Sequence, residues 1–422
     1  MSAENFPKPW LQSYPADIAA EIDLPLYESL PEILEQTYAS FGNAIAVSNM
    51  GSSLTYAELE KLSRDFAAYL QNTLQLQKGD RLAIMLPNVM QYLVVLHAAI
   101  RAGLIVVNVN PLYTARELKE QLKDAEAKAI VVINVRAKIL EQALPDTTIQ
   151  HVIITGLGDM LGFPRSVLVN FVVKYIKHLV PAYHIPNAFS FREALAEGAQ
   201  LPLAKVSITG NDVVFLQYTG GTTGVPKAAM LTHRNIIANM LQCQGWFGEH
   251  IYASVRLAIV PLPLYHVFSL TINAFTVMAL GGRIELITDP RNIKDFVKTL
   301  SKLPFTMITG VNTLYNALLQ NAAFRQLDFS NLSLSIAGGM ATHDTVAADW
   351  HAVTGSFILE GYGLTETSPV VTVNPYNTKE FSGSVGLPVA STLVDIRDDA
   401  GKSLPLGELG EIYVQGPQVM LG

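Results

Sequence analysis

Short apolar runs alternate with helical patterns along most of the chain. Runs at residues 81–86, 105–108 and 129–133 predict buried strands, and the segments between them carry apolar residues at helical spacing. Thr114 precedes one of these helices and Glu117 follows three residues later, which is the spacing of a capping box. The alternation predicts parallel sheets covered by helices on both faces, because a helix usually connects parallel strands.

Changes in this rhythm divide the chain into three parts. The alternation stops within residues 156–205 and returns from residue 212, and short strands at 392–397 and 411–415 then lie between turns rich in Gly and Pro. We therefore expect an α/β fold with two doubly wound sheet-and-helix subdomains, 1–210 and 211–380, and a small β subdomain at 381–422. The first subdomain would carry an apolar and basic insertion near 156–205.

The insertion contains one candidate amphipathic helix at residues 165–180. Asn170, Lys174, Lys177 and His178 fall on one helical stripe, and most of the remaining positions are large and apolar. Such a helix lies either in a bilayer interface or against its own domain with a solvated basic edge.

Residues 257–282 contain no charged side chain and are long enough to span a membrane. Pro261, Pro263, His266 and Asn273 interrupt the apolar run, however. We expect a strand, a turn and a buried helix here instead of a membrane span.

Composition narrows the class of protein. Of 422 residues, 50% are hydrophobic and 15% are charged, which favours large buried sheets over a solvated or disordered chain. The net charge of −7 gives no support for nucleic-acid binding. A single cysteine, Cys243, excludes an intrachain disulfide and a cysteine-rich metal site, which fits a cytoplasmic protein.

A loop rich in Gly and Thr carries the clearest chemistry. Residues 218–227 have the sequence YTGGTTGVPK and lie between candidate strands at 213–217 and 228–231. Glycine backbone, threonine hydroxyls and the Lys227 ammonium together suit a polyphosphate. The Walker A spacing does not fit, because Lys227 lies three residues after Gly224 and Ala228 replaces the magnesium-binding hydroxyl. The alternative is a flexible surface hairpin. The candidate binding residues here are Tyr218, Thr219, Gly220, Gly221, Thr222, Thr223, Gly224 and Lys227.

Two glycine-containing segments follow predicted strands of the second subdomain, where open α/β sheets bind ligands. In EGYGLTETSP (360–369), Gly361 and Gly363 permit close approach and Tyr362 offers a flat face to a purine. Thr365 can donate a hydrogen bond to an oxygen, and Glu366 can hold Mg²⁺. The second segment, AGGM, places Gly338, Gly339 and Met340 between a strand and a helix, where backbone N–H groups are available. By itself this second segment is a weak signal.

These segments closely resemble the signature motifs of the adenylate-forming superfamily, which includes acyl-CoA ligases, firefly luciferase and peptide-synthetase adenylation domains. Supporting segments at 54–59, 79–87, 383–388 and 407–412 extend the resemblance from about residue 40 to residue 422. The resemblance implies the fold of the family's large N-terminal domain. It also implies ATP, bound as AMP after reaction, together with Mg²⁺ and coenzyme A as co-substrate.

The resemblance assigns roles to individual residues. Lys227, His266, Thr365 and Glu366 would be catalytic, with Thr219 and Glu366 near the metal. His266, in PLYHVF, would position the substrate carboxylate and gate an acyl tunnel. Residues 338–340 would line the adenine, and the segments 270–280 and 312–319 would be candidate walls of the tunnel.

Within the superfamily, the sequence most resembles the bacterial long-chain fatty-acyl-CoA ligases, which carry an apolar stretch like residues 159–181. We therefore expect a long-chain fatty acid as substrate, a cytoplasmic location with peripheral contact at the inner face of the cell membrane through 165–180, and no nucleic acid. The sequence leaves open whether the protein forms a homodimer. The alternatives are a ligase for a medium-chain or aryl acid, and a non-catalytic membrane-associated lipid-binding relative.

The resemblance also implies a continuation that the sequence does not contain. Family members add a ribose-binding Asp, a hinge and a mobile lid with a catalytic Lys beyond the point that corresponds to Gly422. We expect the β subdomain at 381–422 to be incomplete, the C-terminal lid domain to be absent, and turnover to be small or lacking.

Overall fold

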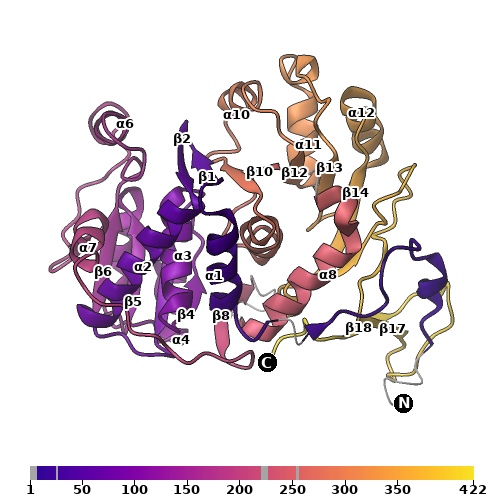
Figure 1. Ribbon diagram of the computed structural model, residues 1–422, viewed down its shortest axis with the longest axis horizontal. Helices are drawn as coiled ribbons and strands as arrows, with labels where there is room; N and C mark the ends of the chain where they lie inside the picture. Colours follow the sequence, from indigo (N-terminus) through magenta and orange to yellow (C-terminus); the bar gives the residue numbers. More distant parts are fainter. Residues whose placement is uncertain (1–6, 25–26, 220–226, 253–255) are drawn as a thin grey trace.

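Two large sheets stand side by side, with helices between them and on their outer faces (Figure 1). The computed structural model describes residues 7–24, 27–219, 227–252 and 256–422. Within this part of the chain the structure also contains a small antiparallel sheet, so the expected α/β fold class is confirmed.

The first sheet has the strand order β7-β6-β5-β3-β4-β8-β9. All neighbouring strands are parallel except β8 and β9, which form an antiparallel hairpin. Its strands are β3 (Arg81–Met85), β4 (Ile105–Asn108), β5 (Ala129–Ile133), β6 (His151–Thr155), β7 (Phe189–Ser190), β8 (Val213–Thr219) and β9 (Lys227–Thr232).

The second sheet has the order β16-β15-β14-β13-β12-β10-β11-β1-β2. The strands from β14 to β1 are parallel, and antiparallel strands close both edges. Its strands are β1 (Ile45–Asn49), β2 (Ser52–Thr55), β10 (Leu257–Val260), β11 (Arg283–Leu286), β12 (Met307–Gly310), β13 (Leu334–Ala337), β14 (Ile358–Gly363), β15 (Val370–Val373) and β16 (Leu387–Pro388).

Strand membership crosses the boundary expected between residues 210 and 211. The early strand β1 pairs with β11 of the second sheet, and the later strand β8 pairs with β4 of the first. The expected boundary therefore does not coincide with the division between the sheets. The reason is that an apolar run reports that a strand is buried but not which sheet it joins.

The largest core lies between the two sheets. Helix α3 (Met90–Arg101) is buried at every position from Met90 to Ile100, and it contacts β1 on one side and β3 and β4 on the other. A helix that is apolar all round belongs in such a layer. The same core includes side chains of α1 (Leu30–Phe41), α2 (Tyr56–Asn72), α7 (Phe191–Gly198), α8 (His233–Tyr252) and η6 (Leu270–Val277).

The outer face of each sheet has its own core. Because side chains alternate along a strand, Ala258 and Val260 face the central core while Leu257 and Ile259 face outward. The outer face of the second sheet packs against α10 (Ile293–Leu300), α11 (Asn312–Leu319) and α12 (Asp344–Thr354). That of the first sheet packs against α4 (Ala115–Asp124), which begins with the expected capping box at Thr114, and α5 (Ala137–Ala143).

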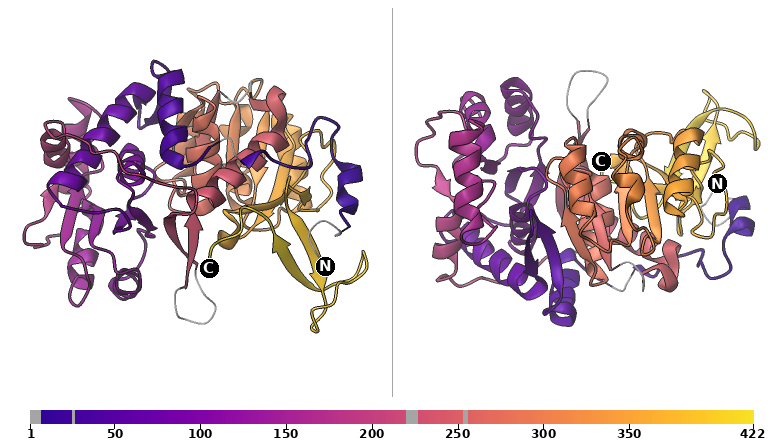
Figure 2. Two further views of the ribbon diagram at one scale, coloured as in Figure 1. Left: turned by 60° about the horizontal axis from the view of Figure 1, so that its bottom comes forward. Right: turned by 90° about the horizontal axis from the view of Figure 1, so that it is seen from above.

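Smaller elements complete the chain. The antiparallel pair β17 (Leu393–Arg397) and β18 (Glu411–Gln415) lies at the far end of the molecule from the first sheet (Figure 2). The insertion forms α6 (Arg165–Phe171), continued by the π-helical turn η5 (Val172–Ile176). The remaining turns are η2 (Pro9–Ser13), η4 (Asn134–Arg136), η7 (Phe324–Gln326) and η8 (Thr365–Thr367).

The apolar segment 257–282 forms a strand, a turn and a buried helix, as expected. Strand β10 is followed by the turn at 261–266, the short helix α9 (Val267–Ser269) and then η6, which is buried throughout. Among the described helices, none has the length and apolar character needed to cross a membrane.

Candidate active site

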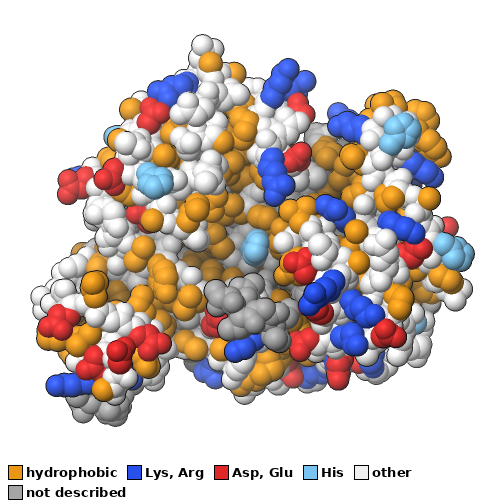
Figure 3. Space-filling view, turned by 180° about the vertical axis from the view of Figure 1, so that it is seen from behind, with side chains coloured by type: hydrophobic (Ala, Val, Ile, Leu, Met, Phe, Trp, Pro, Cys, Tyr) orange, Lys and Arg blue, Asp and Glu red, His pale blue; other side chains and the backbone are white. Residues whose placement is uncertain are grey.

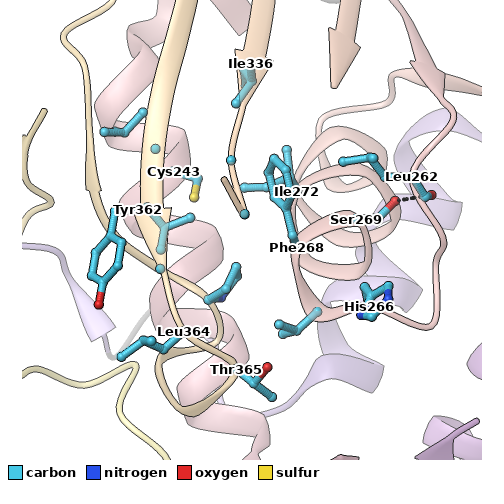
Figure 4. Close-up of a pocket in the computed structure, with 18 of the residues that line it drawn as sticks. Cys243, Leu262, His266, Phe268, Ser269, Ile272, Ile336, Tyr362, Leu364 and Thr365 are labelled. Carbon is cyan, nitrogen blue, oxygen red and sulfur yellow. Dashed lines mark hydrogen bonds between the residues drawn. The ribbon is translucent and has the colours of Figure 1, made fainter. Parts of the chain in front are cut away.

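A pocket of about 370 Å³ lies at one edge of the second sheet. The parallel strands β10, β12, β13 and β14 all end at this edge, so the loops after them meet there. Helix α8 and the α9–η6 segment supply the remaining walls (Figure 4). The predicted site residues that line the pocket are His266, Gly338, Gly339, Gly361, Tyr362, Gly363 and Thr365.

Glycine is required in this wall for steric reasons. A Cβ at Gly363 would lie 2.1 Å from the carbonyl oxygen of Pro369, and one at Gly338 would lie 3.3 Å from that of Gly361. Gly339 has φ +78°, a conformation that side chains disfavour. The backbone itself therefore forms part of the pocket surface.

Buried Glu360 ties the two glycine segments together. Its Oε1 accepts a hydrogen bond of 2.8 Å from the Thr342 N–H, just beyond Gly338–Met340. Its own backbone N–H donates to Asn374 Oδ1 at 2.8 Å. Glu360 precedes Gly361, so these bonds hold both segments in a fixed relation beside the pocket.

A buried polar network positions the loop that ends at His266. Asn88 donates to the carbonyl oxygens of Val260 and Leu262 and accepts from the Leu264 N–H, at 2.9–3.0 Å. The Tyr92 hydroxyl donates to the Leu264 carbonyl at 2.9 Å. Further along the loop, Gln217 Nε2 donates to the carbonyl of Tyr265 at 2.7 Å. The loop between β10 and α9 is therefore fixed by side chains of α3, β8 and the turn before α3.

His266 presents a neutral imidazole to the pocket. It occupies the N-cap position of α9, and its ring packs against Tyr265 with 4.8 Å between ring centroids. Part of the ring is open to solvent, but the apolar surroundings lower the pKa of His266 below its usual value. At neutral pH one ring nitrogen is then an acceptor and the other a donor, which suits a positioning role beside a carboxylate.

Thr365 and Glu366 lie on η8, which packs against β8 and β9. The Met420 N–H donates to the Glu366 carbonyl at 2.8 Å and fixes the backbone of this turn. In the described part of the chain, neither the Thr365 hydroxyl nor the Glu366 carboxylate has a hydrogen-bond or ion-pair partner. Both groups are thus available to a ligand between the pocket and the β8–β9 hairpin.

The predicted phosphate loop joins β8 to β9. Thr219 pairs with Lys227 at the loop end of the hairpin, and the Lys227 side chain is exposed. The Thr219 hydroxyl donates to the Lys227 carbonyl at 3.5 Å. Gly220, Gly221, Thr222, Thr223 and Gly224 lie outside the described residues, so their arrangement stays a prediction.

Three further predicted residues, like Lys227 and Glu366, do not line the pocket. The Tyr218 hydroxyl donates to the Asp124 carboxylate, and neither Tyr218 nor Thr219 lines the pocket. Met340 is 49% exposed, beyond the buried part of its loop. Their roles in binding stay predictions.

The prediction that residues 312–319 form a second wall of the tunnel is wrong. Residues 312–319 form α11, whose buried side chains pack against α12 and the outer face of the second sheet. Only Val311, just before this helix, reaches the pocket. The other expected wall, 270–280, contributes Ile272. The apolar pattern predicted burial correctly in both helices but could not indicate which face of the sheet each would cover.

A preformed metal cage is absent from the described residues, which contain no group of three or more His, Cys, Asp or Glu placed to hold an ion. Mg²⁺ is commonly held by one or two carboxylates together with substrate phosphates. The Glu366 carboxylate, which has no partner among the described residues, fits that pattern.

Sequence reasoning missed the supporting residues Asn88, Gln217 and Glu360. Each is a polar residue at or next to an apolar strand, and each is almost fully buried. A buried polar side chain must find hydrogen-bond partners, so polar residues at strand ends were the available signal.

Comparisons with known proteins agree with this geometry. The family model described as AMP-binding enzyme matches residues 34–422. The long-chain-fatty-acid–CoA ligase of Escherichia coli O6:H1 is 53% identical over 98% of this chain and 74% of its own length. That of Haemophilus influenzae is 49% identical over the same shares.

Solved structures have the same fold. The anthranilate CoA ligase AuaEII in complex with anthranoyl-AMP superposes with a TM-score of 0.80 at 21% identity, over 94% of this chain and 71% of that one. A long-chain-fatty-acid-CoA ligase from Archaeoglobus fulgidus gives 0.79 at 22% identity, over 97% and 78%. With the family model spanning most of the sequence, this chain belongs to the family of AMP-binding enzymes.

Proposed function

We propose that the protein activates a long-chain fatty acid with ATP, forming an acyl-adenylate, and transfers the acyl group to coenzyme A. The observation that carries this proposal is the pocket at the edge of the second sheet. It combines an apolar interior with glycine backbone, a hydroxyl and a neutral imidazole at its mouth. The two long-chain-fatty-acid–CoA ligases that match almost the whole chain support the choice of acid.

The interior suits an acyl chain. Cys243 and Phe247 of α8 face Ile272 of η6, and Ile336 and Val373 extend the wall along the second sheet. In Figure 4, Ile336 lies at the end of the pocket away from His266 and Thr365. A fatty acid would therefore enter with its hydrocarbon tail toward Ile336 and its carboxylate between His266 and Thr365.

The other side of β14 suits a nucleotide. The Tyr362 ring points away from Cys243 and Ile272 in Figure 4 and offers a flat face to adenine. Gly338 and Gly339 allow the purine to approach backbone groups closely. Thr365 would then donate to the α-phosphate, and Lys227 would neutralise the β- and γ-phosphates.

The chemistry has two steps. A carboxylate oxygen of the fatty acid attacks the α-phosphorus of ATP, and the bond to pyrophosphate breaks. The thiolate of coenzyme A then attacks the acyl carbonyl carbon, and AMP leaves. Glu366 would hold Mg²⁺, which spreads the charge on the phosphates. His266 orients the carboxylate, while Thr365 and Lys227 stabilise charge that develops on phosphate oxygens.

The remaining expectations are part of this proposal. They are the cytoplasmic location with peripheral membrane contact, and a homodimer. The role of residues 219–227 as the pyrophosphate cradle also belongs here. The fit of Gly, Thr and Lys to phosphate supports that role.

Displacement of a fluorescent acyl-adenylate analogue tests the choice of substrate. We expect non-hydrolysable adenylates with 12–16 carbons to displace the probe at least ~10-fold better than hexanoyl or benzoyl adenylates, because each buried methylene contributes about 0.8 kcal/mol. Tighter binding of the benzoyl analogue would contradict the long-chain assignment and favour an aryl acid. Binding of free fatty acid with no adenylate preference would favour a lipid-binding protein without ligase activity.

A further inference from the structure

A second cavity lies where α1, α8 and the end of η6 meet. Its volume is about 240 Å³, and no described residue lines both this cavity and the pocket at the edge of the second sheet. Ile272 of η6 faces that first pocket, while Ala279, just beyond η6, faces the second cavity. We call the second one the α1 cavity. Its apolar surface is supplied by Ile33, Phe41, Ile237, Met240, Leu241 and Ala279.

Polar side chains without partners also line the α1 cavity. They are Gln36, Thr37, Ser40 and Gln244, and within the described residues none of these side chains forms a hydrogen bond. Thr37 is only 6% exposed, so its hydroxyl is largely shielded from bulk water. A buried hydroxyl without a partner is costly, so a ligand atom that bonds to Thr37 would gain the energy of a missing hydrogen bond.

A smaller hollow of about 10 Å³ adjoins the α1 cavity and shares Ile33, Thr37 and Ala279 with it. Buried His97 lines this hollow. Its Nδ1 lies 2.6 Å from the Tyr38 hydroxyl, and its Nε2 has no hydrogen-bond partner among the described residues. Two unsatisfied polar groups, the Thr37 hydroxyl and the His97 ring, therefore lie at the inner side of the α1 cavity. This arrangement favours a ligand that carries a polar atom at its inner end.

The lining of the α1 cavity carries no charge among the described residues, since it includes no Asp, Glu, Lys, Arg or His. Charged side chains of both signs are scattered over the face of the molecule seen in Figure 3, so an uncharged lining narrows the class of ligand. A carboxylate or phosphate would lose its hydration in this cavity without gaining a cation. A molecule with an apolar body and an uncharged hydroxyl avoids that cost.

We propose that the α1 cavity binds an aliphatic alcohol of medium chain length. The ligand hydroxyl bonds to the hydroxyl of Thr37, and its hydrocarbon chain packs against Ile33, Ile237 and Met240. The site is thus distinct from the acyl pocket in position and in the charge of its ligand. This inference does not rest on the proposed ligase function, because binding here requires neither nucleotide nor turnover.

Titration with octanol tests the site, with NMR of isotope-labelled methionine methyl groups as the readout. Met240 lines the α1 cavity and is absent from the lining of the acyl pocket, so its methyl signal reports this site alone. Met240→Leu assigns the signal. We expect octanol to shift it with a saturable dependence, and octanoate to bind at least ~10-fold more weakly, because its charge would be buried without a partner.

Two substitutions on α1 locate the ligand within the cavity. Thr37→Val keeps the shape of the side chain and removes its hydroxyl, so octanol should bind ~3–10-fold more weakly. Ser40→Trp places an indole in the cavity and should weaken octanol binding by ~10-fold or more, because the ligand and the indole would compete for the same space. Ala39→Trp is the matched control: Ala39 is an exposed neighbour on α1 that does not line the cavity, and octanol affinity should stay unchanged.

Three results would each overturn the proposal. They are the lack of a saturable shift of the Met240 signal in the wild type, octanoate binding as tightly as octanol, and equal octanol affinity of Ser40→Trp and Ala39→Trp. The first two use the wild-type protein, so they do not depend on how well the variants fold. Unchanged unfolding midpoints confirm that the α1 variants are folded.

Discussion

At the scale of single residues, the site depends on close approach of backbone segments. Gly363 lies where β14 passes the carbonyl of Pro369, and Gly338 lies where β13 ends beside Gly361. These glycines could be identified from the sequence because they occur in motifs that resemble a known superfamily. Their physical role, which is to let two loops meet at one pocket wall, became visible only with the fold.

Gly363→Ala tests this role. Its Cβ would lie 2.1 Å from the Pro369 carbonyl oxygen, so the backbone must shift. We expect the free energy of unfolding to fall by about 1–3 kcal/mol and the affinity for an acyl-adenylate analogue to fall at least tenfold. Gly245→Ala is the matched control, since a Cβ there meets nothing within 4 Å and Ala favours a helix by about 0.5–1 kcal/mol. Equal effects of the two substitutions would contradict this view of the pocket wall.

Ile272→Trp tests the acyl wall. This side chain of η6 lines the pocket, and an indole would occupy part of its 370 Å³. We expect the affinity for a hexadecanoyl-adenylate analogue to fall at least ~10-fold, while acetyl-adenylate binding changes less than ~2-fold, because only the long chain needs the lost volume. Competition binding with both analogues measures the difference. Parallel losses for both would show that Ile272 acts on the nucleotide side or on folding.

At the scale of elements, the helices and strands followed from the sequence pattern. Strand β10, its turn and the buried η6 form where the apolar run and its prolines predicted them. The capping box at Thr114 also forms. The sequence pattern did not predict which face of the second sheet α11 covers, because a helix with a single apolar stripe can pack on either face. The contacts of Asn88 and Glu360 were not predictable for a related reason: they join segments far apart in the chain.

His233, the first residue of α8, links this element to α1. Its Nδ1 accepts from the Leu30 N–H at 3.2 Å, which requires the neutral imidazole. Burial lowers the pKa of His233 to about 4, with Asp212 opposing the shift and Lys78 adding to it. Burial likewise lowers the pKa of His97 to about 3. In the unfolded chain both imidazoles have the ordinary histidine pKa of about 6.5.

The free energy of unfolding should therefore decrease as the pH falls from about 6.5 toward 5. In this range the unfolded chain takes up protons that the folded protein excludes, and each such histidine contributes up to about 1.4 kcal/mol per pH unit. His233→Asn keeps an acceptor near Leu30 but cannot titrate, so it should remove one histidine's share of the slope. Denaturant unfolding of both proteins at pH 7.5, 6 and 5 measures how the free energy of unfolding changes with pH. An unchanged slope would contradict the assignment of a buried neutral imidazole.

At the scale of the whole molecule, the two sheets cooperate at one site. The hairpin β8–β9 belongs to the first sheet, yet η8 of the second half packs against it. Residues 420–422 also reach this place: the Leu421 N–H donates to the carbonyl of Met230 in β9, and the Met230 N–H donates to the carbonyl of Gly422, both at 2.9 Å. The sequence predicted two α/β units, but the exchange of β1 and β8 between sheets depends on pairing across long separations that local patterns do not encode. The β8–β9 hairpin and η8, which carries Thr365 of the pocket, are thus in contact at the junction of the sheets.

Calorimetric titration with a non-hydrolysable dodecanoyl-adenylate analogue tests the central claim most directly. We expect binding that falls at least ~10-fold in Lys227→Ala and in Thr365→Val, because each would lose a charged or hydroxyl donor to phosphate oxygens. Lys294→Ala, which removes an exposed lysine of α10, is the charge-matched control and should bind like the wild type. No binding by the folded wild-type chain, or equal binding by all four proteins, would contradict an acyl-adenylate site at the junction of the two sheets.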